Sequence, residues 1–202
     1  MCSLSSVLTG FALALSVLGP TSSLANCSDV ANHLVQSRAS QGDLDAQTYL
    51  ARKFLFENCS VVQQQRGLDM LLAAANSGHG PAQFDLGRLL LTEAASNAEE
   101  REALAMIGRA AQSGLIEAQE FFGHLTVERA ATPEQRDEGF FWLGSAANQG
   151  SLRAAMVVYT LYRDGLHGVV ADQCLAAHWA EAAHLLSEPD ARAPSLLDQT
   201  CH

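Results

Sequence analysis

The feature that most constrains the fold of this chain is a short phrase that returns four times at a fixed step. In each copy a glycine is followed four residues later by an alanine, and successive copies lie 36 residues apart. The glycines are Gly42, Gly78, Gly114 and Gly150, and the alanines are Ala46, Ala82, Ala118 and Ala154. A fixed period in this range is typical of proteins built from stacked supersecondary units. We therefore expect a repeat protein.

Each step contains the pattern of two helices. In the first step, Asp43 is placed to cap a helix whose apolar face includes Tyr49, and Gly78 is placed to end the second helix in the left-handed conformation. In the third step, Thr132 opens the second helix, in which we expect Phe141 to face inward. Large and small residues also keep a fixed register, which suits closely packed antiparallel helices. The pattern predicts an all-α solenoid of antiparallel helix pairs.

The period also predicts the domain organisation. The stretch before the first glycine has the register of a second helix without a first one, so it is expected to be an N-terminal capping helix. The expected segments are a signal peptide over 1–25, the capping helix over 26–41, repeats over 42–77, 78–113, 114–149 and 150–186, and a tail over 187–202.

The first 25 residues look like an export signal. An apolar run over 7–18 is followed by Ser23-Leu24-Ala25, the small-x-small pattern that signal peptidase cuts. The run is too short for a comfortable membrane span. The sequence thus predicts a periplasmic or secreted protein that is cleaved near Ala25 and has no integral membrane span in its mature chain.

Four cysteines remain after that cleavage, and an even number in an oxidising compartment predicts two disulfides. Four cysteines allow three pairings. We favour Cys27 with Cys59 and Cys174 with Cys201, because each pair then ties one end of the stack, where a repeat has only one neighbour. Cys174 also falls at a register that earlier repeats fill with solvent residues, so its partner is expected in the tail.

Three stretches of the chain share a pattern with known repeat proteins: residues 82–87 (Ala-Gln-Phe-Asp-Leu-Gly), 139–150 and the glycine-rich 162–172. They resemble, in that order, the start, the end and the centre of the pattern of the Sel1-like repeat family, which is related to the tetratricopeptide repeats. Repeats one to three lack the central G-x-G-V turn, so their loops are expected to differ. The resemblance covers about residues 42–186. It implies a protein–protein interaction scaffold, adaptor or regulator in the bacterial cell envelope.

Charge and motifs exclude some functions. A net charge of −10 argues against non-specific binding to nucleic acid or anionic membranes. The sequence holds no G-x-S-x-G, P-loop, Rossmann glycine or H-E-x-x-H motif, so we expect neither an enzyme nor a cofactor. The family resemblance also brings two alternatives. One is a cysteine-rich, β-lactam-binding or hydrolysing enzyme, although repeats two and three lack the cysteine pair of that type. The other is a flagellar-motor-associated periplasmic component.

A zinc site near the C-terminus is the most specific chemical alternative to a disulfide there. Cys174 and His178 are four residues apart on one expected helix, His184 follows, and Cys201 and His202 end the chain. Such ligands suit tetrahedral zinc. Because exported cysteines usually oxidise, we favour a disulfide and predict no metal.

The resemblance also suggests where a partner binds, because the first helices of tetratricopeptide-type stacks line the ligand-facing surface. The residues six and ten positions after each repeat glycine are Thr48, Arg52, Phe84, Arg88, Glu120, His124, Met156 and Thr160. Among them, Arg52 and Arg88 would lie side by side and suit an acidic partner segment. The alternative, that both arginines pair with surface carboxylates of this chain, stays open.

Overall fold

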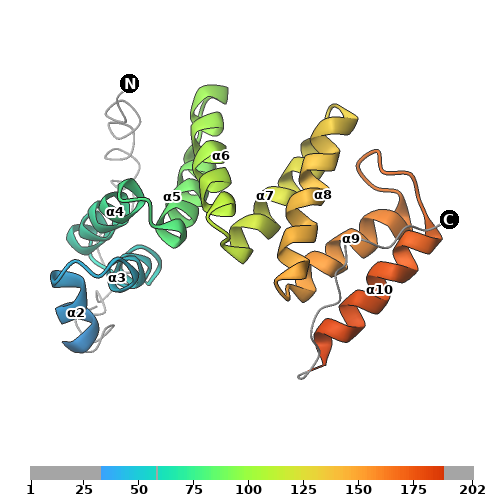
Figure 1. The fold of residues 1–202 in the computed structure, drawn as a ribbon. Coiled ribbons are helices and arrows are strands. Elements are labelled where there is room, and N and C mark those ends of the chain that lie inside the picture. The colour runs from blue at the N-terminus through green and yellow to red at the C-terminus, as the bar shows by residue number, and fades with distance from the viewer. Residues whose placement is uncertain (1–32, 58, 189–202) are drawn as a thin grey trace. The chain divides into compact units, whose positions relative to one another are not determined.

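The computed structural model describes residues 33–57 and 59–188, and these residues form a succession of helices (Figure 1). The helices are α2 (His33–Ser40), α3 (Leu44–Phe56), α4 (Val61–Asn76), α5 (Gly80–Glu93), α6 (Asn97–Gln112), α7 (Ile116–Arg129), α8 (Pro133–Asn148), α9 (Leu152–Asp164) and α10 (Gln173–Ser187). The predicted signal peptide, Cys27, Cys201, His202 and nearly all of the tail lie outside the described residues.

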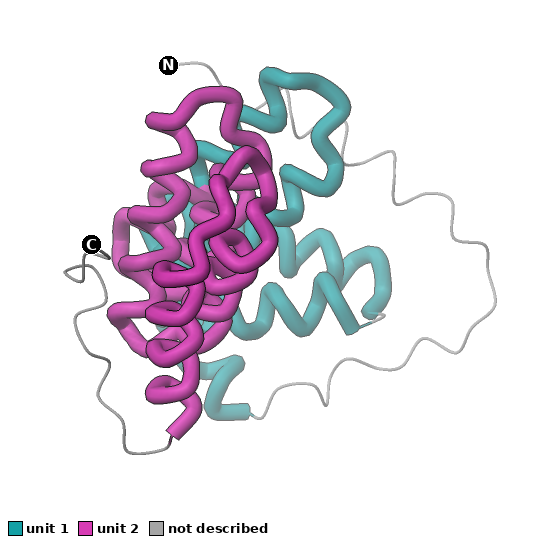
Figure 2. The backbone as a smooth tube through the Cα atoms, turned by 90° about the vertical axis from the view of Figure 1, so that its right-hand side faces the viewer, with its two compact units in different colours: residues 1–106 teal, residues 107–202 magenta. Residues whose placement is uncertain are grey.

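The chain divides into two compact units, coloured in Figure 2: residues 1–106 (unit 1) and 107–202 (unit 2). The boundary falls inside α6 and therefore inside the second predicted repeat. In unit 1, α3 packs against α2, α4 and α5. In unit 2, α8 packs against α7 and α9, and α9 packs against α10. Each unit thus shows the consecutive helix packing that the repeat pattern predicts.

The repeat glycines end the second helix of each pair. Their φ angles are +90°, +83°, +90° and +99° at positions 42, 78, 114 and 150, a conformation that L side chains rarely adopt. At the second of these turns the Gly78 N–H donates to the Ala75 carbonyl (3.0 Å), and the His79 N–H donates to the Ala74 carbonyl (3.1 Å). The same pair of bonds recurs at the other three turns. This is the Schellman motif, so the predicted left-handed helix ends are confirmed.

In the first three repeats, a glutamine next to the repeat alanine ties the first helix to the helix before it. The side-chain amide of Gln47 donates to the Ala39 carbonyl (3.0 Å), and Gln119 donates to the Ala111 carbonyl (3.1 Å). Gln83 makes the equivalent bond in the second repeat. The fourth repeat has Ala155 at this position and lacks the bond. These amide bonds, of which those of Gln83 and Gln119 are buried, hold consecutive helices at a fixed register.

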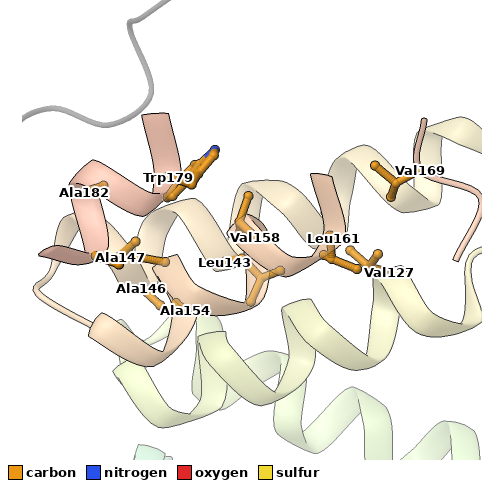
Figure 3. Packing of buried hydrophobic residues seen from close by; sticks show 12 residues of the cluster. Val127, Leu143, Ala146, Ala147, Ala154, Val158, Leu161, Val169, Trp179 and Ala182 are labelled. Atoms are coloured by element: carbon orange, nitrogen blue, oxygen red, sulfur yellow. The ribbon is translucent and has the colours of Figure 1, made fainter. Parts of the chain in front are cut away.

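Large side chains set against alanines form the core of each unit. In unit 2, Leu143 and Val158 are fully buried and Trp179 is 7% exposed, and they share one cluster with Ala147 and Ala154 (Figure 3). In unit 1, the corresponding cluster includes Leu71 and Leu86. Small residues at fixed positions allow the helix backbones to approach closely, as the register in the sequence predicted.

Two aromatic residues that we expected to face inward are exposed. Tyr49 is 45% exposed, because Leu50 and Phe54 already fill the inward face of α3. Phe141 is 55% exposed. It stands between Phe140, which stacks on Tyr162 of α9, and Trp142, which packs edge-on against Phe122 of α7. Three consecutive helical residues cannot all point at the core, since each turns by about 100°.

Candidate functional site: the first-helix surfaces

The predicted partner-binding residues lie on α3, α5, α7 and α9, and the structure separates them by burial. Thr48 (3% exposed) and Phe84 (7%) belong to the core of unit 1. The Thr48 hydroxyl donates to the Leu44 carbonyl within its own helix, so it presents nothing to a partner. The other six residues are exposed or half-buried: Arg52, Arg88, Glu120, His124, Met156 and Thr160.

In unit 1, an ion pair joins the two first helices. The Arg52 guanidinium on α3 donates from Nη2 to Oδ1 of Asp85 on α5 (3.0 Å), and its Nε donates to the other carboxylate oxygen. The Asp85 side chain is only 9% exposed, whereas that of Arg52 is 50% exposed. A bidentate arginine–carboxylate pair fixes the plane of the guanidinium. Arg52 thus pairs with a carboxylate of this chain, but with the buried Asp85 and not with a surface carboxylate as the alternative above supposed for both arginines.

Other cations of unit 1 lie on aromatic rings. The Arg88 guanidinium lies 5.6 Å from the centre of the Phe84 ring, and the Lys53 ammonium lies 5.7 Å from that of Tyr49. Lys53 also forms an ion pair with Glu57. We call Tyr49, Arg52, Lys53 and Arg88 the unit 1 first-helix surface. It combines cations with an exposed tyrosine, and arginine and tyrosine are enriched at the binding hot spots of proteins.

In unit 2, the equivalent helices meet through an anion. The Ser151 hydroxyl at the start of α9 donates to the Glu120 carboxylate on α7, and the Arg153 Nε lies 3.9 Å from the same carboxylate. Met156 is 46% exposed and His124 is exposed. We call Glu120, His124, Arg153, Met156 and Thr160 the unit 2 first-helix surface. It carries one central carboxylate where the unit 1 first-helix surface carries guanidinium groups.

Sequence reasoning missed several residues that shape these surfaces, among them Tyr49, Asp85 and Ser151. Tyr49 and Asp85 both stand seven positions after a repeat glycine, one position beyond the set that we selected. Ser151 caps α9 by accepting a hydrogen bond from the Ala154 N–H (2.9 Å). Because the cap by itself explains a serine at this position, the second bond of its hydroxyl, to Glu120, was not predicted. The signal for the first two was present, because positions seven and ten are neighbours on one face of a helix.

Cys59 and Cys174 are each disulfide-bonded in the structure. Cys174 is exposed on α10, as its register predicted. Which cysteine pairs with which stays a prediction, because Cys27 and Cys201 lie outside the described residues. A sulfur held in a disulfide offers no thiolate to a metal. Across 33–57 and 59–188, no group of three or more His, Cys, Asp or Glu side chains is arranged to hold a metal ion.

Comparison with solved structures identifies the fold. The crystal structure of a Sel1 repeat protein from Oxalobacter formigenes matches with a TM-score of 0.60 and 25% sequence identity. The match covers 77% of this chain, and this chain spans 44% of that protein's length. The fold is that of a Sel1-like repeat protein. Neither a family model nor a curated protein sequence matches.

The Sel1-like fold confirms the predicted all-α solenoid class. A fold of this kind suggests a scaffold for protein–protein interactions. In the part of the chain that the structure describes, no helix is long and apolar enough to span a membrane.

Proposed function

We propose that this protein is an exported adaptor of the bacterial cell envelope, which holds a segment of a partner protein on the first-helix surface of unit 1. The observation that carries this proposal is the arrangement of Tyr49, Arg52 and Arg88 on the adjacent helices α3 and α5. The two helices are joined by the bonds from Arg52 to Asp85. An exposed tyrosine ring with the Lys53 ammonium over it, on the same helix as the oriented Arg52 guanidinium, favours a protein partner over a small metabolite.

The partner segment is proposed to be acidic. The two bonds to Asp85 hold the Arg52 guanidinium in one fixed plane at the surface. Because the Arg52 side chain remains half exposed, a partner carboxylate can approach its outer edge. The pair with Asp85 orients that edge before binding, which lowers the conformational entropy lost in the complex. Arg88, placed over Phe84, offers a second cation on the next helix.

The experiment is in-cell cross-linking followed by affinity capture of the tagged, exported protein. The principal variant is Arg88→Glu, which reverses one charge and leaves the Arg52–Asp85 pair intact. The matched control is Arg101→Glu, since Arg101 is an exposed arginine on α6, a second helix. We expect one dominant partner that is captured by the wild type and the control and is lost or strongly reduced with Arg88→Glu.

A second variant addresses Arg52. Arg52→Gln removes the charge while retaining a donor for Asp85, so it disturbs the fold less than a glutamate would. Thermal unfolding followed by circular dichroism establishes that each variant is folded before capture is compared. Equal capture of the partner by folded Arg52→Gln/Arg88→Glu protein would exclude the unit 1 first-helix surface as the binding site.

Export is tested separately by sequencing the N-terminus of the protein purified from its native cells. We expect the mature chain to begin at Asn26. A chain that retains Met1 would contradict the envelope location, although it would leave the binding surface standing.

A further inference from the structure

The described part of unit 1 begins with half of a repeat. The Gly42 turn ends α2 in the same way as the later repeat glycines end α4, α6 and α8, so α2 has the register of a second helix. It packs against α3, the first helix of the next repeat. No first helix precedes α2 among the described residues, and the later repeats show which side chains such a helix would cover.

The first of these side chains lies on α2. In the first repeat, Met70 stands eight positions before the repeat glycine and packs against the cluster that contains Leu50 of α3. In the third repeat, Trp142 stands at the same position and meets the Phe122 ring of α7 edge-on, with 6.1 Å between the ring centres. A residue at this position therefore packs on the first helix of its own repeat. In α2 the residue is Leu34, which is 72% exposed.

The other side chains lie on α3. In the later repeats, the residues that contact the preceding first helix stand one, three or seven positions after the repeat glycine, and they are Ser151, Arg153 and Asp85. In the first repeat, the second and third of these positions hold Asp45 and Tyr49. The Asp45 carboxylate lies 3.3 Å from His79 Nε2 yet its side chain is 79% exposed, and Tyr49 is 45% exposed. We call Leu34, Asp45 and Tyr49 the half-repeat face, because a first helix before α2 would cover all three.

The mature chain is too short at this end to cover the half-repeat face with a first helix of its own. The first helices α3, α5, α7 and α9 are 13 or 14 residues long. Cleavage after Ala25, as proposed above, leaves residues 26–32 before α2, and this stretch is only half as long as a first helix. A helix on the half-repeat face is therefore expected to come from another molecule.

We propose that the partner protein contributes an amphipathic helix, which takes the place of a first helix beside α2 and α3. Its apolar side covers Leu34 and Tyr49, in the way that an amphipathic helix lays its apolar face into a groove. This assignment rests on the proposed function, because Tyr49 also belongs to the unit 1 first-helix surface. It adds that the bound segment is helical and that it completes the half-repeat.

The charges beside the half-repeat face indicate which residues the partner helix carries. Arg52 and Lys53 follow Tyr49 by three and four positions, so they lie on the same side of α3. Carboxylates along one flank of the partner helix meet these two cations, in agreement with the acidic segment proposed above. Asp45 precedes Tyr49 by one turn, so a basic residue is expected at that end of the partner helix.

The place of the partner helix is tested by photo-cross-linking of the full-length exported protein in its native cells. Benzoylphenylalanine is incorporated in place of Leu34 or Tyr49. Val62 of α4 is the control position, because it is 79% exposed and does not belong to the half-repeat face. We expect the first two positions, but not the control, to cross-link to one segment of one partner at helical spacing. Cross-links to this chain, to a second copy of it or to the apolar run of an uncleaved signal peptide would overturn the proposal, and so would the absence of any cross-link.

The helical form is tested with the cross-linked segment as a synthetic peptide. We expect it to bind the mature protein and to gain helical circular dichroism on binding. A proline at the centre of the peptide is expected to weaken binding at least about tenfold, whereas a proline in its first turn is tolerated. Equal binding of the two proline peptides would overturn the helical form.

Two variants separate this assignment from the proposed function. Leu34→Glu places a carboxylate under the apolar side of the partner helix, and Val62→Glu makes the same change at the control position. Both side chains are exposed, so both variants are expected to fold, which circular dichroism checks. We expect capture of the cross-linked partner to fall about tenfold with Leu34→Glu and to stay unchanged with Val62→Glu.

The outcomes distinguish the two proposals. Capture that is lost with Arg88→Glu but not with Leu34→Glu would keep the unit 1 first-helix surface and overturn the helix on the half-repeat face. Capture that neither variant lowers would overturn both proposals. An equal loss with Leu34→Glu and Val62→Glu would overturn the half-repeat face as the specific seat of the partner.

Discussion

The two units place the same elements at the same register but join their first helices by different polar contacts. In unit 1 the first helices meet through a guanidinium, with Arg52 bonded to Asp85. In unit 2 they meet through a carboxylate, with Glu120 accepting from Ser151 and facing Arg153. The glycine turns, the helix order and the alanine-lined core are shared by both units. The repeat backbone therefore provides a scaffold, and the exposed side chains of each unit decide what that unit is able to bind.

The units also differ in how closely their helices approach. In unit 2, a Cβ added at Gly139 of α8 would lie 2.8 Å from the Gly123 carbonyl oxygen and 2.8 Å from the Val127 nitrogen of α7. In unit 1, a Cβ at Gly67 would meet the Phe54 Cβ at 2.9 Å and the Ala51 carbonyl oxygen at 3.1 Å. The Cβ added in unit 2 would therefore press on two backbone atoms of α7, whereas the Cβ added in unit 1 would press on one backbone atom and a side chain. Backbone atoms move aside less easily than side chains, so the contact between α7 and α8 has less room for a methyl group.

The largest expected effect is therefore that of Gly139→Ala. The new methyl group forces α7 and α8 apart, and we expect a loss of about 2–3 kcal/mol in the free energy of unfolding. Gly67→Ala is expected to cost about half as much. Gly108→Ala is the control, because its Cβ would make an ordinary 3.5 Å contact with Phe122 and helix propensity would gain up to about 1 kcal/mol. Urea unfolding gives the free energy of unfolding of all three variants. Equal losses for Gly67→Ala and Gly139→Ala would contradict the difference in helix approach between the two units.

The next effect concerns the two ionic contacts. Arg52→Gln leaves the nearly buried Asp85 carboxylate without its cation, and we expect a loss of about 1–2 kcal/mol. Glu120→Gln keeps an acceptor for the Ser151 hydroxyl and is expected to cost less than about 0.5 kcal/mol. Chemical denaturation of both variants checks the asymmetry. If Glu120→Gln proves the more damaging, the carboxylate of unit 2 rather than the ion pair of unit 1 is the structural contact.

A smaller effect is expected to be the same in both units. Ser60 and Thr132 each cap the second helix of their repeat through a capping box, with Gln63 and Gln135 as the reciprocal partners. Ser60→Ala and Thr132→Ala should each cost about 1 kcal/mol. Since the two caps make the same reciprocal pair of hydrogen bonds, thermal unfolding should give similar shifts. A difference of severalfold would show that the first turns of α4 and α8 differ in stability for reasons beyond their caps.

The smallest effect is a pH dependence that the N-cap of α3 in unit 1 has and the N-cap of α9 in unit 2 lacks. The Ala46 N–H and the Arg38 guanidinium hold the pKa of Asp43, which caps α3, below its usual value of 3.8. An acid whose pKa is lower in the folded state stabilises the fold above its ordinary pKa, and this contribution is lost as the pH falls through the folded value. Between about pH 5 and pH 3, wild-type thermal stability should fall more than that of Asp43→Asn. Ser151 is the equivalent residue in unit 2, and its hydroxyl caps α9 without titrating in this pH range. The protection of the amides at the start of α9 against exchange should therefore not fall together with the stability of the α3 cap.

What the sequence determined by itself is the repeat: its period, its helix pairs and the glycines that end them. These features follow from local rules, since a left-handed helix end needs glycine and a close helix contact needs a small residue, and both leave a fixed spacing in the chain. The outward position of Cys174 was predictable in the same way, because register alone places a residue on one side of a helix.

The tertiary structure decided which side chains reach a partner. Thr48 and Phe84 share a predicted position on the first helices, yet both are buried, whereas Tyr49 is exposed. Pairing across 33 residues, as between Arg52 and Asp85, leaves no local signature, because it depends on how neighbouring helices are rotated against each other. A rotation of one residue moves a side chain by about 100° around its helix, from the core to the surface, while the repeat period stays unchanged.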